Sequence, residues 1–94
     1  MIRYNKRVVK AIEKGDIPLK IAQSFYNIFV TLDQTKDFNM FDIKKLKSCE
    51  KILTYRLRKG RYRAIFRLLD ESLDIMLIGK REEVYKLWEQ LQSD

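Results

Sequence analysis

Between residues 53 and 68 the chain alternates, residue by residue, between mostly apolar and mostly basic side chains, and this alternation constrains the fold more than any other feature. A period of two is typical of a β-strand with one buried and one exposed face. The alternation breaks at Lys59-Gly60, where Gly supplies the positive φ of a tight turn. The stretch therefore predicts a β-hairpin, and its apolar face carries Leu53, Tyr55, Leu57, Tyr62, Ala64, Phe66 and Leu68.

The other face of this hairpin collects arginine side chains. A two-residue turn sets Arg58 opposite Arg61, and the next pair along the strands is Arg56 and Arg63. Opposed residues of antiparallel strands point to the same side, with Cβ atoms about 4.5–5.5 Å apart, and like charges placed there destabilise the pair. No Asp or Glu lies between residues 51 and 69 to offset the repulsion. We therefore expect an anion site on this face, with a merely solvated basic face as the alternative.

Helical spacing appears on both sides of the hairpin. Asn5 is a suitable helix cap, Gly15 ends the first helix, and Pro18 suits the first turn of a second helix that reaches about Thr35. We expect an α+β fold, a small antiparallel β-sheet packed against an N-terminal α-hairpin, with a C-terminal helix and the helices on one face. The expected order is β-α-α-β-β-β-α over a single domain, residues 1–94. Its other parts are a strand over residues 2–4, a polar connector over 37–48, an apolar central strand over 73–78 and a helix over 82–91.

The charge balance points to a polyanionic partner. The 94 residues include 20 Lys and Arg against 13 Asp and Glu, a net charge of +7. For so small a domain, such an excess is typical of a protein that binds nucleic acid or an acidic protein.

Missing residue types exclude several chemistries. The chain has no His, which excludes Ser-His-Asp and Cys-His nucleophilic sites and His-based metal sites. Its single cysteine, Cys49, can form neither a zinc site nor an intramolecular disulfide, which suits a reducing compartment. The three glycines are isolated, so no phosphate loop is expected. We expect no cofactor, no metal and no membrane association, and a cytoplasmic location.

Two linked motifs resemble those of a known family. Residues 55–66 (YRLRKGRYRAIF) resemble the signature YRLRVGDYRVIY of the RelE/ParE toxin superfamily, and residues 78–85 (IGKREEVY) resemble its ending VGHRREVY. The resemblance implies a RelE-like fold and the toxin of a type II toxin–antitoxin system. The resemblance further implies a ribosome-dependent endoribonuclease that cleaves mRNA in the A site and inhibits translation, and that is silenced by a RelB-like antitoxin protein.

The resemblance also implies a site. Arg56, Arg63 and Arg81 would bind and stabilise the scissile phosphate. Tyr85 would stack on a base and orient the substrate, or assist proton transfer. The residues expected to bind RNA around them are Arg58, Arg61, Lys59, Lys80 and Lys47.

One position departs from the family pattern. RelE-type enzymes often carry a Lys, the candidate general base, two residues before the position of Arg56, and this chain has Thr54 there. Strand alternation puts Lys51 on the opposite face. The general base is therefore unassigned, with Lys47, Lys80 and Glu82 as candidates.

Three functions follow from these residues. The retained Arg63, Arg81 and Tyr85 favour the endoribonuclease. The Thr54 substitution favours a ParE-like DNA gyrase inhibitor that acts by binding without cleavage. A non-toxic basic binding module is the third.

Overall fold

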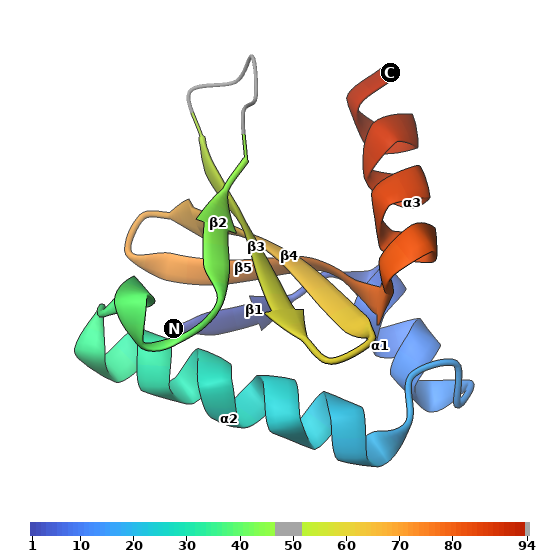
Figure 1. Cartoon of the computed structure of the whole chain (residues 1–94), viewed down its shortest axis with the longest axis horizontal. Coiled ribbons are helices and arrows are strands. Elements are labelled where there is room, and N and C mark those ends of the chain that lie inside the picture. Colours follow the sequence, from blue (N-terminus) through green and yellow to red (C-terminus); the bar gives the residue numbers. More distant parts are fainter. Residues whose placement is uncertain (47–51, 94) are drawn as a thin grey trace.

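The computed structural model describes residues 1–46 and 52–93, and it confirms the α+β fold class. Figure 1 shows α2 running along one side of the sheet, with α3 standing well apart from it. In chain order the elements are β1 (Ile2–Tyr4), α1 (Lys6–Glu13), α2 (Leu19–Thr35), the 3₁₀ helix η1 (Phe38–Met40), β2 (Ile43–Lys45), β3 (Leu53–Lys59), β4 (Tyr62–Leu69), β5 (Ser72–Lys80) and α3 (Arg81–Ser93).

The five strands form one mixed sheet in the order β1-β5-β4-β3-β2. Strand β1 pairs in parallel with β5, whereas the other three pairings are antiparallel. The sheet is therefore not purely antiparallel as expected. The chain leaves β1 through the helices α1 and α2 before it reaches the rest of the sheet, and a long connection of this kind is what parallel strands require.

Strand β2 is an addition to the expected order, because it lies in the stretch that the sequence predicts to be a polar connector. Its three residues pair with β3, with Ile43 opposite Leu57. Two flanking backbone hydrogen bonds extend the pairing, from Leu46 N–H to the carbonyl of Thr54 and from Arg58 N–H to the carbonyl of Asp42, each 2.9 Å long. A three-residue strand is too short to show a period, so pairing with β3 defines it.

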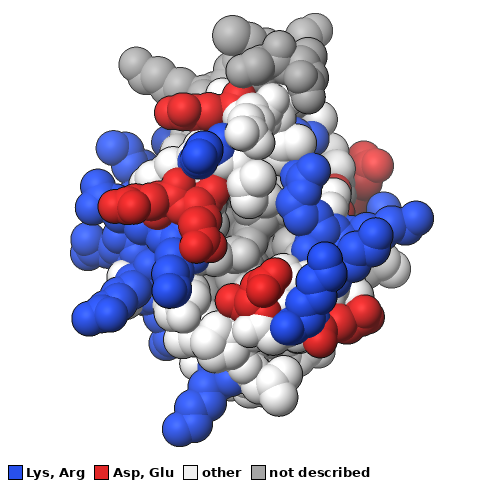
Figure 2. All heavy atoms as spheres, turned by 90° about the vertical axis from the view of Figure 1, so that its right-hand side faces the viewer, with Lys and Arg blue, Asp and Glu red and all other residues white. Residues whose placement is uncertain are grey.

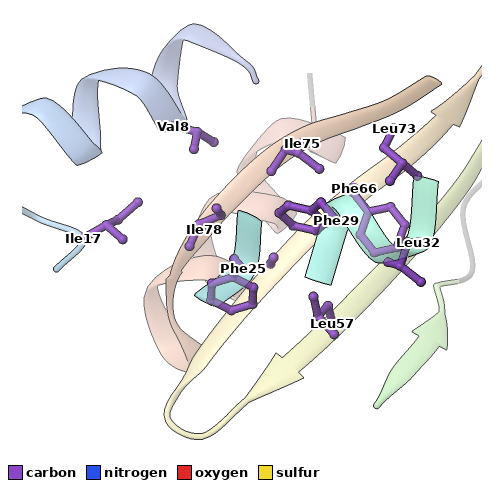
Figure 3. Close-up of a cluster of buried hydrophobic side chains, with 11 residues drawn as sticks. Val8, Ile17, Phe25, Phe29, Leu32, Leu57, Phe66, Leu73, Ile75 and Ile78 are labelled. Atoms are coloured by element: carbon purple, nitrogen blue, oxygen red, sulfur yellow. The ribbon is translucent and has the colours of Figure 1, made fainter. Parts of the chain in front are cut away.

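The larger part of the core lies between the sheet and the helices α1 and α2. Phe25, Phe29 and Leu32 of α2 point toward Leu57 and Phe66 of the sheet, and all five are fully buried (Figure 3). The ring centroids of Phe29 and Phe66 are 5.8 Å apart in an edge-to-face arrangement, which is favourable for aromatic pairs. The predicted helix cap is also confirmed, because the Asn5 side chain accepts a hydrogen bond from Arg7 N–H at 2.9 Å.

Helix α3 packs against the opposite face of the sheet, so the expectation that all helices share one face was wrong. A second buried cluster there joins Ile65 of β4 and Leu77 of β5 to Val84 and Trp88 of α3. Ile65 is the one apolar residue among the arginines that alternate along β4. It gives α3 an apolar surface to bury, and β5 is covered on both faces as its apolar sequence predicts.

The turn between β3 and β4 is shifted from its predicted place. Lys59 pairs with Tyr62, so the two turn residues are Gly60 and Arg61 rather than Lys59 and Gly60. Gly60 has φ +60°, and Gly at the first central position is typical of a type II′ hairpin turn. The register therefore moves by two residues, which changes the pairs but, outside the turn, keeps the side chains on their predicted faces.

Candidate functional site

The corrected register brings three arginines together on the α3 side of the sheet. Arg58 lies directly opposite Arg63, and Arg56 lies opposite Ile65. Arg56 is then a diagonal neighbour of Arg63, within about 7–8 Å, which is within reach of long side chains. We call Arg56, Arg58 and Arg63 the arginine face. The predicted clustering is confirmed, although Arg61 belongs to the turn instead of facing Arg58.

Arg63 is the most firmly held of the three. Its residue is only 7% exposed, and its Nη1 donates to the carbonyls of Gly60 at 2.8 Å and Tyr62 at 2.9 Å. These bonds attach the guanidinium to the backbone of the hairpin turn. A cation that is already fixed loses little conformational entropy when an anion binds. Pre-organised charge of this kind stabilises a transition state most effectively.

Tyr85 projects from α3 toward the arginine face. Partial burial raises the pKa of its phenol. The guanidinium of Arg56, followed by that of Arg63, stabilises the phenolate by hydrogen bonding and charge, and the net effect holds the pKa of Tyr85 below its ordinary value. One phenol is therefore close to two guanidinium groups, and three of the four predicted catalytic residues meet at one place.

The start of α3 lies close to the β3–β4 turn. The backbone N–H of Arg81, the first residue of the helix, donates to the carbonyl of Arg61 at 3.1 Å. A Cβ on Gly79 would lie 3.3 Å from Cγ2 of Val84, so the absence of a side chain there leaves room for the first turn of α3. The side chain of Arg81 is exposed. The structure therefore places this predicted catalytic residue beside the β3–β4 turn, at the exposed rim of the site.

The predicted RNA-binding residues divide between the two faces of the sheet. Arg58 belongs to the arginine face. Lys59 and Lys80 both pair with Tyr62, so their side chains start on the opposite side of the sheet. Lys47 lies outside the described residues.

Thr54 occupies the position where RelE-type enzymes often carry a lysine, and its side chain is buried and hydrogen-bonded to the backbone. The residue is 1% exposed, and its hydroxyl donates to the carbonyl of Ile52 at 3.3 Å. Among the remaining candidates, Lys80 and Glu82 are exposed at the junction of β5 and α3. Lys51 lies outside the described residues.

The sequence reasoning missed Asp42. Its Oδ1 lies 3.3 Å from Nη2 of Arg56, and its Oδ2 pairs with Nε of Arg58. Asp42 lies outside residues 51–69, the stretch that contains no acidic residue. The pairing of β2 with β3 places its carboxylate at the arginine face. Only the pairing of β2 with β3 could have revealed it.

Figure 2 shows basic side chains along both flanks of the face that it draws, separated by acidic and uncharged residues. Within residues 1–46 and 52–93, no three His, Cys, Asp or Glu residues are grouped so that they could hold a metal ion. None of the helices in these ranges has the length and apolar character needed to cross a membrane.

Comparison with known proteins identifies relatives of the whole chain. A protein of Methanocaldococcus jannaschii assigned as the toxin RelE1 is 32% identical over 88 residues, which cover 90% of this chain and 93% of that protein. No family model matches the chain.

Solved structures give the same result for the fold. The archaeal RelE–RelB complex of Pyrococcus horikoshii OT3 contains a chain that is 26% identical, with a TM-score of 0.68 and coverage of 85% of this chain and 92% of that one. The RelB–RelE antitoxin–toxin complex of Methanococcus jannaschii gives a TM-score of 0.71 at 22% identity, over 92% of this chain and 98% of that one. At that identity the likeness bears on the fold alone.

Proposed function

We propose that this chain, which belongs to the RelE toxin family, is the toxin of a type II toxin–antitoxin system. Its proposed activity is cleavage of mRNA in the ribosomal A site. The single observation that carries the proposal is the meeting of Arg56, Arg63 and Tyr85 at one place on the arginine face. The fold alone does not carry it, because one fold can serve several functions.

The chemistry that such a site supports is attack of a ribose 2′-hydroxyl on the adjacent phosphate. The oxygen–phosphorus bond that forms replaces the bond to the 5′-oxygen, leaving a 2′,3′-cyclic phosphate. The departing 5′-oxygen takes up a proton from solvent and becomes a free 5′-hydroxyl. Negative charge grows on the phosphoryl oxygens during this step. The guanidinium groups of Arg56 and Arg63 stabilise that charge, since each offers paired donors that stay protonated at any physiological pH.

Tyr85 is positioned to handle a proton in this reaction. Its lowered pKa increases the fraction of phenolate at a given pH, and a phenolate accepts a proton from the attacking hydroxyl. Its ring, carried on α3, also offers a surface on which a base stacks. Arg81 at the rim would contact the phosphate once RNA is bound.

The partner that this function requires is an antitoxin protein. The related chain of Pyrococcus horikoshii OT3 was solved as a complex of RelE with RelB. A net charge of +7 suits an acidic segment that folds on the toxin surface. We propose a RelB-like antitoxin for this chain, with mRNA and the ribosome as its targets.

The experiment that tests the proposal is primer extension on ribosomes programmed with a defined mRNA. We expect A-site cleavage by the wild-type protein, and loss of that cleavage in Arg63→Ala and Arg81→Ala. The matched control is Arg7→Ala, which removes the same charge from an exposed position of α1 and is expected to cleave normally. Equal cleavage by all four proteins would show that the arginine face is not the catalytic site.

A second candidate function is gyrase inhibition by binding alone. The buried Thr54, which cannot replace a lysine base, favours it. Growth arrest by the wild-type protein without any cleavage would move the assignment to gyrase. Neither cleavage nor arrest would indicate a basic binding module.

A further inference from the structure

A carboxylate of the chain itself occupies part of the arginine face. Asp42 uses one oxygen for each of two guanidinium groups, with Oδ1 3.3 Å from Nη2 of Arg56 and Oδ2 paired with Nε of Arg58. The hydrogen bond from Arg58 N–H to the carbonyl of Asp42 fixes the backbone beside these side chains. The pairing is therefore set by the register of β2 on β3.

Stability alone does not explain this arrangement. The side chain of Asp42 is 41% exposed, that of Arg58 is 55% exposed and that of Arg56 is 18% exposed. An ion pair whose carboxylate is this open to solvent contributes little to the free energy of unfolding. The position of the carboxylate on the arginine face bears on ligand binding instead. A phosphate oxygen and a carboxylate oxygen accept from the same guanidinium donors, so an RNA phosphate and Asp42 compete for Arg56 and Arg58.

We propose that Asp42 is a specificity-determining residue, whose carboxylate competes with RNA phosphates for Arg56 and Arg58 and keeps the affinity for free single-stranded RNA low. The inference rests on the proposed function, in which the arginine face holds an RNA phosphate. The described ion pairs of Asp42 are with Arg56 and Arg58, so it does not compete for Arg63, whose Nη1 donates to the turn carbonyls. An RNA that is also held by contacts elsewhere would displace Asp42 from the two arginines. A free strand without those contacts gains less binding free energy when its phosphate replaces the carboxylate.

The test measures binding without cleavage. A fluorescently labelled single-stranded RNA with every 2′-hydroxyl methylated cannot be cut, and fluorescence anisotropy over a range of KCl concentrations gives its affinity and salt dependence. We expect Asp42→Asn to bind about 3- to 10-fold more tightly than wild type at low salt. The plot of log affinity against log salt steepens by about 0.7 for each additional phosphate that the variant neutralises.

Three controls make the result specific. Asp70→Asn raises the net charge by the same amount from the β4–β5 turn, where φ is +47° and Asn is well tolerated, and we expect a much smaller increase in affinity. Asp42→Glu keeps the carboxylate, and we expect it to bind like wild type. Arg56→Ala reports whether the arginine face holds the RNA at all.

The outcomes separate the two proposals. Weaker binding by Arg56→Ala, together with unchanged or weaker binding by Asp42→Asn, would overturn the role of Asp42 and leave the proposed function intact. An equal increase in affinity for Asp42→Asn and Asp70→Asn would also overturn it, because net charge alone would then explain the effect. Wild-type binding by Arg56→Ala would overturn both proposals.

Discussion

The two faces of the sheet differ in what their side chains are for. On the α2 side, Leu57, Ala64 and Phe66 are fully buried against α1 and α2. On the α3 side, among the residues that the structure describes, the fully buried apolar residues of the sheet are Ile65 and Leu77, and basic side chains cover the part nearest the β3–β4 turn. The first face holds the fold together by burial, whereas the second gives up apolar area in order to present charge. We therefore expect substitutions on the first face to act on stability and those on the second to act on activity.

The largest expected effect is on the α2 side. Phe29→Ala removes a ring that is fully buried and packs edge-to-face on Phe66. We expect the free energy of unfolding, measured by urea denaturation, to fall by about 3–5 kcal/mol because a cavity replaces the ring. Tyr26→Ala is the matched control on the same helix, since Tyr26 is 46% exposed. A similar loss in both variants would mean that burial does not set the difference.

Arg56→Ala is expected to have the opposite profile. We expect A-site cleavage to fall by about 100-fold, because one donor to the developing charge is lost. The free energy of unfolding is expected to fall by about 1–2 kcal/mol, less than in Phe29→Ala, because the Arg56 side chain is 18% exposed but its partner Asp42 is 41% exposed. Single-turnover cleavage and urea denaturation on the same preparation provide both values. A loss of stability as large as that of Phe29→Ala would make the arginine face part of the core.

Tyr85→Phe probes the proton in the same site. Arg56 and Arg63 hold the pKa of Tyr85 below its ordinary value, so the phenolate fraction grows as the pH rises toward that lowered pKa. If the phenolate accepts the proton, the cleavage rate rises with pH over this range, and Tyr85→Phe loses both the rise and about tenfold in rate. Normal pH dependence in Tyr85→Phe, with weaker RNA binding, would leave only the stacking role. The measurement is a pH–rate profile of both proteins.

The smallest expected effect is at the turn that joins the two strands. Gly60→Ala places a Cβ at φ +60°, which destabilises the native turn by about 1 kcal/mol. Nothing lies within 4 Å of that Cβ, so the loss comes from the backbone and not from a clash. Thermal unfolding measures it. Because the turn carbonyls hold Arg63, we also expect a modest fall in cleavage, and unchanged cleavage would show that Arg63 keeps its place without a strict turn geometry.

How much of the fold and of the candidate site could be predicted from the sequence depends on how far apart along the chain the interacting residues lie. The two faces of the hairpin were predictable because strand alternation is local, and a register error of two residues left each side chain outside the turn on its face. The turn position was wrong because Gly suits either central place of a tight turn. The role of Tyr85 came only from the resemblance, since nothing local brings α3 over the arginines. That placement depends on the burial of Ile65 against Trp88, which is a tertiary contact.

Asp42 marks the other limit of the sequence reasoning. Asp42 is placed by the pairing of Ile43 with Leu57. This pairing joins two segments that lie on either side of residues 47–51 in the sequence. Strand β2 has no alternation to reveal it, and two of its three residues are lysines. Short edge strands with lysines are common because they discourage pairing with other chains. Their sequence therefore looks like a loop.

The parallel pairing of β1 with β5 has a consequence for how the protein is made. Ile2 of β1 pairs with Leu73 of β5, so β1 joins the sheet only after β5, the last of the five strands along the chain, has been synthesised. Contacts between such distant segments slow folding, because a long loop must close before they form. A nascent chain that ends before β5 leaves β1 without its partner and lacks α3, and with it Tyr85. The group of Arg56, Arg63 and Tyr85 therefore comes together only after β5 and α3 are in place.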